Sequence, residues 1–175
     1  LFSTRYLIFC REVIKDAQTY IPEFLDNIID KNLICLNFIR CPNDQLPLFN
    51  GASESSLNEL EEYLGPRTKN KNTSKIIGGL FKIKQKNHVV FFDVGSPPQK
   101  KFSQCYQSGP LSFEYFLDGV KIISNSGFGN NISSKAQLLS RLTACQSTLT
   151  LNDTSVNKFE RNKLINKVFG NSIKN

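Results

Sequence analysis

The sequence predicts an α+β fold in which helices come first and antiparallel β-structure follows. Apolar residues recur at helical spacing before residue 41, whereas short runs rich in β-branched and aromatic residues alternate with turn residues after residue 75. The chain has 175 residues, of which 39% are hydrophobic, and this is enough for a core of ordinary size. Residues 42–74 are predicted to link the two parts.

Two helices are predicted before residue 41. "STRYLIFCREVIKDAQ" indicates the first, capped by Ser3. Pro22 suits the first turn of the second, whose apolar residues fall at helical spacing: Phe24, Leu25, Ile28, Ile29, Leu33, Leu36 and Ile39. Other apolar residues lie off that stripe, so we expect this helix to be covered on more than one side. The pair is typical of the last two helices of a larger helical assembly.

The linker is predicted to contain a strand and a short helix. "LPLFNG" is apolar and closes with the turn dipeptide Asn50-Gly51. Ser56 and Glu59 form a capping box for a helix that ends at Gly65-Pro66.

The extended runs after residue 75 together predict a large antiparallel sandwich. One hairpin turns at Lys86-Asn87, a second turns at Asp118-Gly119, and "CQSTLTLNDTS" is predicted to be a further strand. In the second hairpin, alternation assigns one face to Leu111, Phe113, Tyr115 and Leu117, and a more polar face to Ser112, Glu114 and Phe116.

Charge and composition limit the partners. The net charge of +7 suits an acidic partner, either nucleic acid or an anionic polysaccharide, but a solvated loop surface rich in lysine is the simpler explanation. No basic helix face or nucleic-acid motif accompanies the charge, so we expect no nucleic-acid partner. The apolar runs are far shorter than the roughly 20 residues of a membrane helix, so no membrane insertion is expected. The five cysteines are odd in number and lack C-x-x-C spacing, which predicts free thiols.

Catalytic constellations are sparse. His88 is the one histidine, and it opens an apolar strand where a structural role is expected. Asp93, Glu114, Cys105 and Cys145 are the metal-ligand types near strands, and they make a weak case for a metal site.

Four stretches carry a family resemblance: "LPLFNGASE", "FDVGSPP", "SGPLSFEYFLDGVKIISNSGFG" and "RLTACQSTLTLNDTS". Their order and spacing resemble those of the heparinase II/III-like proteins of bacteria, a polysaccharide-lyase family. The resemblance implies an N-terminal α/α toroid followed by antiparallel β domains. Residues 1–41 would then be the last toroid helices, 42–74 a linker, and 75–175 an incomplete β-sandwich domain, all within a C-terminal fragment of a longer protein.

The resemblance also implies an activity, which is β-elimination on an acidic, uronate-containing polysaccharide. In that chemistry a tyrosine or histidine takes the proton next to the uronate carboxylate, and a polar or cationic neighbour stabilises the enolate. The family's toroid residues for this step would lie upstream of Leu1. The family also implies a location in the cell envelope or periplasm. A catalytically inactive carbohydrate-binding or scaffold protein of the same fold is the alternative.

The residues departing from the family pattern concern metal binding. Relatives with a metal site have histidines at the positions of Gln107 and Gln146 and an aspartate or asparagine at Asn125, and some have a histidine at Cys105. A carboxamide is a poor zinc ligand and cannot act as a base near neutral pH. We therefore expect no metal or other cofactor, and amides that hydrogen-bond one another, nearby backbone or a sugar. The alternative is that these positions do not converge.

Glu114 and Arg141 complete the candidate cleft residues, with Gln107, Asn125 and Gln146. Glu114 would either orient the substrate or a neighbouring base, or it would be a structural carboxylate paired with Arg141 or with turn amides.

Overall fold

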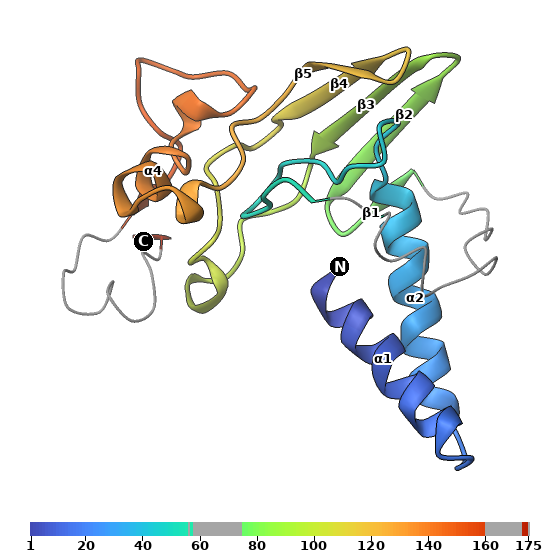
Figure 1. Ribbon diagram of the computed structural model, residues 1–175. Coiled ribbons are helices and arrows are strands. Elements are labelled where there is room, and N and C mark those ends of the chain that lie inside the picture. Colours follow the sequence, from blue (N-terminus) through green and yellow to red (C-terminus); the bar gives the residue numbers. More distant parts are fainter. Residues whose placement is uncertain (56, 58–74, 160–172, 175) are drawn as a thin grey trace.

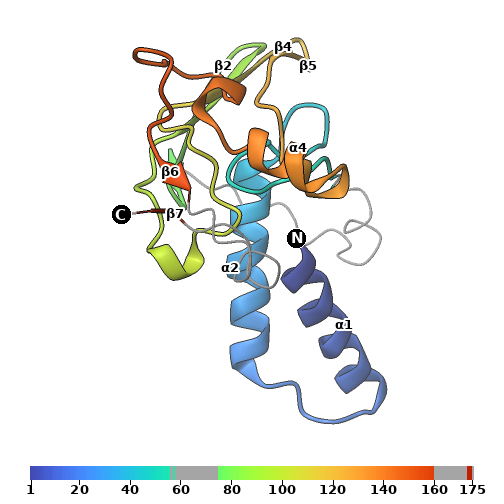
Figure 2. The same ribbon diagram turned by 90° about the vertical axis from the view of Figure 1, so that its left-hand side faces the viewer.

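A pair of antiparallel helices stands beside a twisted β-sheet in the computed structural model (Figure 1). The structure describes residues 1–55, 57, 75–159 and 173–174. Helix α1 spans Phe2–Asp16 and helix α2 spans Glu23–Ile39. Figure 2 shows the two helices projecting together from the β-rich part of the chain. The α+β class predicted from the sequence is confirmed.

The helices pack through apolar residues that lie on their facing sides: Ile8, Leu25, Ile29, Leu33 and Leu36, joined by Leu57. An ion pair between Arg11 Nε and Asp26 Oδ1, 2.5 Å apart, also connects them. Helix α1 begins one residue earlier than its predicted cap, with Leu1 at the N-cap position and Ser3 inside the first turn. Pro22 is the N-cap of α2.

Both helices also carry large apolar side chains that are exposed in this chain: Phe2, Tyr6, Phe9, Val13, Phe24 and Ile28. Their exposure agrees with a helical pair that packs on further helices, and that packing stays a prediction. No helix in the described part of the chain has the length and hydropathy of a membrane-spanning segment.

Five antiparallel strands form the sheet in sequence order: β1 (Ile76–Ile77), β2 (Leu80–Gln85), β3 (His88–Asp93), β4 (Phe113–Leu117) and β5 (Val120–Ile123). Both predicted hairpin turns are present. Lys86 has φ +53°, and Asp118 and Gly119 have φ +50° and +83°, the left-handed values that a tight primed turn requires. Elsewhere β6 (Lys158–Phe159) pairs with β7 (Ile173–Lys174).

Short helices fill the segments beside the sheet. These are the 3₁₀ turns η2 (Lys100–Phe102), η3 (Gly129–Asn131) and η4 (Thr143–Cys145), and helix α4 (Ser134–Leu139). The hydroxyl of Ser133 caps α4 by accepting a hydrogen bond from the Ala136 amide at 3.0 Å.

The linker covers one face of the sheet. Phe49 from the linker, together with Cys41 just before the linker, packs against Val89, Phe91 and Phe116. Glu114 and Phe116 are both 0% exposed, whereas Phe113, Tyr115 and Leu117 are only half-buried. The face predicted to be the more polar one is therefore the buried face, because the linker packs on it.

Two predicted strands are absent from the described residues. "CQSTLTLNDTS" forms η4, bends and a single bridge between Leu151 and Thr154. Its side chains bond to backbone instead of leaving the backbone to pair, as when Thr148 Oγ1 donates to Pro110 O at 2.6 Å. "LPLFNG" is not a strand either, although its turn is formed, with φ +48° at Asn50 and +91° at Gly51. Apart from Leu57, the helix predicted from Ser56 to Gly65 lies outside the described residues.

Candidate functional site

Gln107 joins three segments of the chain. It lies in the loop between η2 and β4, and its side chain is buried, with 1% exposed. Its Oε1 accepts a hydrogen bond from the Gly51 amide at 3.0 Å. Its Nε2 donates to Gly127 O and to Ser140 O, both at 2.8 Å. The amide thus ties the linker turn, the segment after β5 and the end of α4 to one point.

Gln146 meets Gln107 at the same acceptor. Its Nε2 donates to Ser140 O at 2.7 Å, so both glutamine amides bond to one carbonyl. Gly109 allows this approach, because a Cβ at that position would lie 2.9 Å from Gln146 Cγ. The alternative in which these two positions do not converge is therefore wrong. We name Gln107, Gln146 and Ser140 the amide site.

The linker turn at the amide site has a second anchor. Asn50 Nδ2 donates to Asp93 Oδ2 at 2.9 Å, and the Gly95 amide donates to the other carboxylate oxygen at 3.1 Å. Burial raises the pKa of Asp93 above its ordinary value, and these two hydrogen bonds partly oppose that rise. The turn is close-packed, since a Cβ at Gly51 would come within 2.6 Å of Cys105 Cβ.

The contacts of the amide site do not fit a metal ion. The Gln107 oxygen already accepts from a backbone amide and its nitrogen faces two carbonyls, while the carboxamide of Gln146 is a neutral and poor zinc ligand. Across the described ranges, no three His, Cys, Asp or Glu side chains gather as a metal site would need.

Asn125 lies beside the Gln146 segment and retains an unused donor. Its Oδ1 accepts from the amide and the hydroxyl of Ser147, both at 3.0 Å. Its side chain is buried, and Nδ2 has no hydrogen-bond partner in the described chain. A buried amide without an acceptor costs about 1–3 kcal/mol, so a buried water bonded there would remove that cost.

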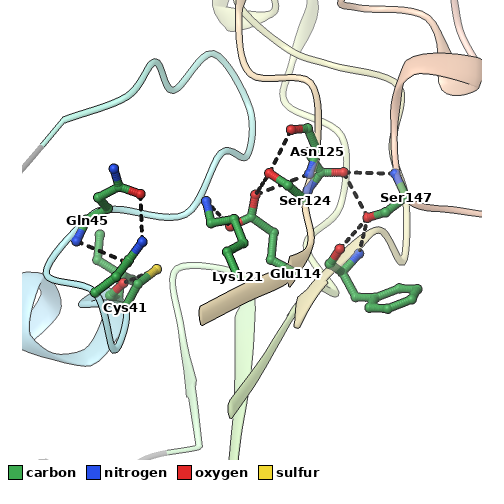
Figure 3. A network of polar contacts seen from close by, with 10 residues as sticks. Cys41, Gln45, Glu114, Lys121, Ser124, Asn125 and Ser147 are labelled. Carbon is green, nitrogen blue, oxygen red and sulfur yellow. Dashed lines mark hydrogen bonds and ion pairs between the residues drawn. The ribbon is translucent and has the colours of Figure 1, made fainter. Parts of the chain in front are cut away.

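Glu114 is the buried centre of a polar network (Figure 3). Its Oε1 accepts from Ser124 Oγ at 3.1 Å and from the Asn125 amide at 3.2 Å. Its Oε2 lies 3.2 Å from Lys121 Nζ, an ion pair whose angles are not those of an aligned hydrogen bond. The interpretation of Glu114 as a structural carboxylate bound by a turn amide agrees with these contacts, and its cationic partner is Lys121.

The network leads from Glu114 to the segment that holds Gln146. Asn125, whose amide binds Glu114, holds the Ser147 amide through its side chain, and Ser147 Oγ in turn donates to Phe113 O. Glu114 is therefore a positioning residue that fixes the backbone on both sides of the amide site. Sequence reasoning missed Lys121 and Ser147. Lys121 was detectable, because the register pairs it with the inward-facing Phe116.

Arg141 binds the backbone of the loop that precedes Gln107. Its guanidinium is 1% exposed and donates to Tyr106 O at 2.8 Å and Ser103 O at 2.7 Å. It also stacks 4.0 Å from the centre of the Phe159 ring. Burial lowers its pKa to about 10, so it stays charged at neutral pH. Arg141 therefore holds the backbone of residues 103–106. The predicted pairing of Arg141 with Glu114 is wrong, because the cation that pairs with Glu114 is Lys121.

Comparison of the sequence with known protein families identifies the family of this chain. The sequence model of the "Heparinase II/III-like, C-terminal" family matches residues 77–172, which is more than half of the chain. This chain belongs to that family. Comparison with curated proteins finds no match.

Solved structures of similar fold are heparinases. Heparan sulfate lyase HepC from Pedobacter heparinus shares 18% identity with a TM-score of 0.58, and the match covers 91% of this chain and 32% of that one. A heparinase III shares 14% identity with a TM-score of 0.57, over 80% of this chain and 26% of that one. Another heparinase III shares 12% identity with a TM-score of 0.56, over 90% and 33%. These likenesses establish the fold, and this chain spans about a third or less of the length of each structure.

Proposed function

We propose that this chain is part of a polysaccharide lyase that cleaves a uronate-containing polysaccharide by β-elimination. Its family and its fold support a protein related to polysaccharide lyases. The reaction, the polymer and a location in the cell envelope or periplasm are expectations from the family. The net charge of +7 suits an acidic polymer as substrate.

The observation that carries the proposal is the half-buried Gln146, which meets Gln107 at Ser140 O and lines an open pocket with Ser147 and Thr148. The half-buried amide of Gln146 can donate hydrogen bonds to sugar oxygens and carboxylates but takes no proton from carbon, whereas Gln107 and Asn125 are buried and position the backbone around it. In this proposal the β domain binds and orients the polymer. The base that removes the proton next to the carboxylate belongs to the helical part of the full-length protein.

The second candidate is a carbohydrate-binding protein of the same fold without catalysis. The replacement of histidines seen in relatives by Cys105, Gln107 and Gln146 favours it, because no imidazole remains at these positions. Both candidates use the same surface, and they differ in whether a bond is broken.

Product analysis separates the candidates. The full-length protein is incubated with heparan sulfate, with polyglucuronate and with neutral dextran, while ultraviolet absorbance and new reducing ends are followed. β-Elimination leaves an unsaturated uronate that absorbs, so we expect both signals to rise together on an acidic polymer. Reducing ends without absorbance would reject β-elimination, and binding without either signal would establish the second candidate.

A matched pair of variants tests the site. Gln146→Ala removes an amide from the amide site, whereas Gln104→Ala removes a half-buried one outside it, which bonds to Lys101 O. We expect the first to lower kcat/KM at least tenfold and the second to leave it within twofold. Equal activities in the two variants would show that the amide site takes no part in substrate binding.

A further inference from the structure

A cationic groove lies at the opposite end of the sheet from the amide site. It runs between the C-terminal end of α2 and the tips of the two hairpins, and it encloses about 670 Å³. Four of its lining residues are basic: Arg40, Lys82, Lys84 and Lys86. Two are acidic: Asp44 and Asp118. Figure 1 shows the end of α2 beside β2, where the groove is formed.

The strand geometry gathers the lysines on one side. Lys82 and Lys84 are two residues apart in β2, so their side chains leave the same face, roughly 7 Å apart. Their partners across the strand pair are Phe91 and Val89, neither of which carries a charge. Lys86 follows in the hairpin turn and also lines the groove. The row of positive charge therefore has no carboxylates opposite it on β3.

The acidic residues of the groove have other partners. Asp44 Oδ1 pairs with Arg40 Nε at 2.8 Å, and Asp118 Oδ1 accepts from Asn87 Nδ2 at 2.7 Å. No ion pair joins either carboxylate to Lys84 or Lys86 in the described chain, and both lysines are exposed.

Lys82 forms the half-buried floor of the groove. Its Nζ donates to Phe38 O at 2.7 Å and to Arg40 O at 3.0 Å, so it satisfies carbonyls at the end of α2 and offsets the negative end of the helix dipole. Burial lowers the pKa of Lys82, and repulsion from Lys84 lowers it further. An anion in the groove would relieve that repulsion, which makes the groove selective for negative charge.

The lining chemistry selects the type of ligand. No aromatic side chain lines the groove in the described chain, so neither stacked bases nor a neutral sugar held on a ring fits it. A flexible polymer with charges repeated along its length matches a row of ammonium groups. We propose that this groove binds an acidic polysaccharide at a second site, separate from the amide site. The choice of polymer rests on the proposed function, whereas the anion selectivity rests on the groove alone.

The test compares two variants with the same change in net charge. Lys84→Glu/Lys86→Glu reverses the two exposed groove lysines, and Lys31→Glu/Lys135→Glu reverses two exposed lysines on α2 and α4 that do not line the groove. Binding of the full-length proteins to heparan sulfate is measured at several salt concentrations, with neutral dextran as the blank.

We expect the groove variant to weaken binding at least tenfold at low salt, with a shallower salt dependence than the wild type, and the control to stay within twofold. Equal weakening in both variants would show an effect of net charge and would overturn the proposal. Competition by duplex DNA that is stronger than competition by a second acidic polysaccharide would overturn it too, by assigning the groove to nucleic acid.

The outcome is independent of catalysis. If the groove variant loses binding and the wild type forms no unsaturated product, the groove proposal stands and the lyase proposal is rejected. If the wild type forms unsaturated product and the groove variant binds normally, the groove proposal is rejected and the lyase proposal stands.

Discussion

Glu114 and Lys84 lie on the same face of one sheet, yet they meet opposite surroundings. Glu114 on β4 is 0% exposed and is bound by Lys121, Ser124 and the Asn125 amide. Lys84 on β2 is exposed and has no carboxylate partner in the described chain. The linker covers the sheet at one end and leaves it open at the hairpin tips. Charge near the amide site therefore serves the fold, while charge at the tips is available to a ligand.

The largest expected effect is at Glu114. Glu114→Ala leaves Lys121 without its carboxylate and the Asn125 amide without its acceptor, so we expect the free energy of unfolding to fall by about 3–5 kcal/mol. Chemical denaturation of the full-length protein measures it. Glu114→Gln, which keeps an acceptor, should lose less. A loss below about 1 kcal/mol for the alanine variant would show that the network is not structural.

Gln107 comes next. Gln107→Ala leaves the Gly51 amide without its acceptor, while Gly127 O keeps its bond from Ser126 Oγ; one such unpaired group costs about 1–3 kcal/mol, so we expect a loss of about 1–3 kcal/mol. Gln104→Ala, at a half-buried glutamine that bonds to the nearby Lys101 O, is the control and should stay within about 0.5 kcal/mol. Similar losses in the two variants would contradict the assignment of Gln107 as the tie between segments.

Cys41 gives a pH-dependent effect. Its folded pKa is raised by burial to about 12 from the ordinary 9.0, so the folded state resists ionisation. The stability this provides is complete below pH 9 and is lost as pH rises toward 12, because the unfolded thiol ionises first. At pH 10 the wild type should have lost about 1.4 kcal/mol more than Cys41→Ala, relative to pH 8. Cys10→Ala, at an exposed thiol, should retain the wild-type pH dependence.

The smallest expected effect is at the hairpin tips. Lys84→Glu/Lys86→Glu should change the free energy of unfolding by less than about 0.5 kcal/mol, since these side chains make no ion pair in the described chain. Thermal and chemical denaturation of this variant and of the Glu114 variants, measured in parallel, compares the stability contributed by the two ends of the sheet. A loss comparable to that of Glu114→Ala would show that both ends of the sheet serve the fold alike.

The sequence predicted those parts of the fold that local chemistry determines. Helical spacing located α1 and α2, and Asp118-Gly119 located its turn, because each depends on neighbouring residues. Alternation placed Glu114 and Phe116 on one face of β4. It could not tell that this face is buried, because the covering residues, Cys41 and Phe49, come from far along the chain.

The candidate site was predicted as a set of positions and not as a network. The resemblance singled out Gln107 and Gln146, and their amide chemistry predicted hydrogen bonds in place of a metal. Their shared acceptor, Ser140 O, is a backbone atom that no side-chain pattern marks. The strand predicted at residues 145–155 failed for the same reason, since Thr148 bonds to the backbone of a distant segment.

The central claim is that the amide site is closed by hydrogen bonds within the chain and holds no metal. Elemental analysis of the full-length protein, purified and dialysed without chelator, tests it most directly. We expect far less than one zinc per chain, and the same content in Gln146→Ala, because the Gln107 and Gln146 amides are already bonded to backbone. One zinc per chain in the wild type that is lost in Gln146→Ala would contradict the claim.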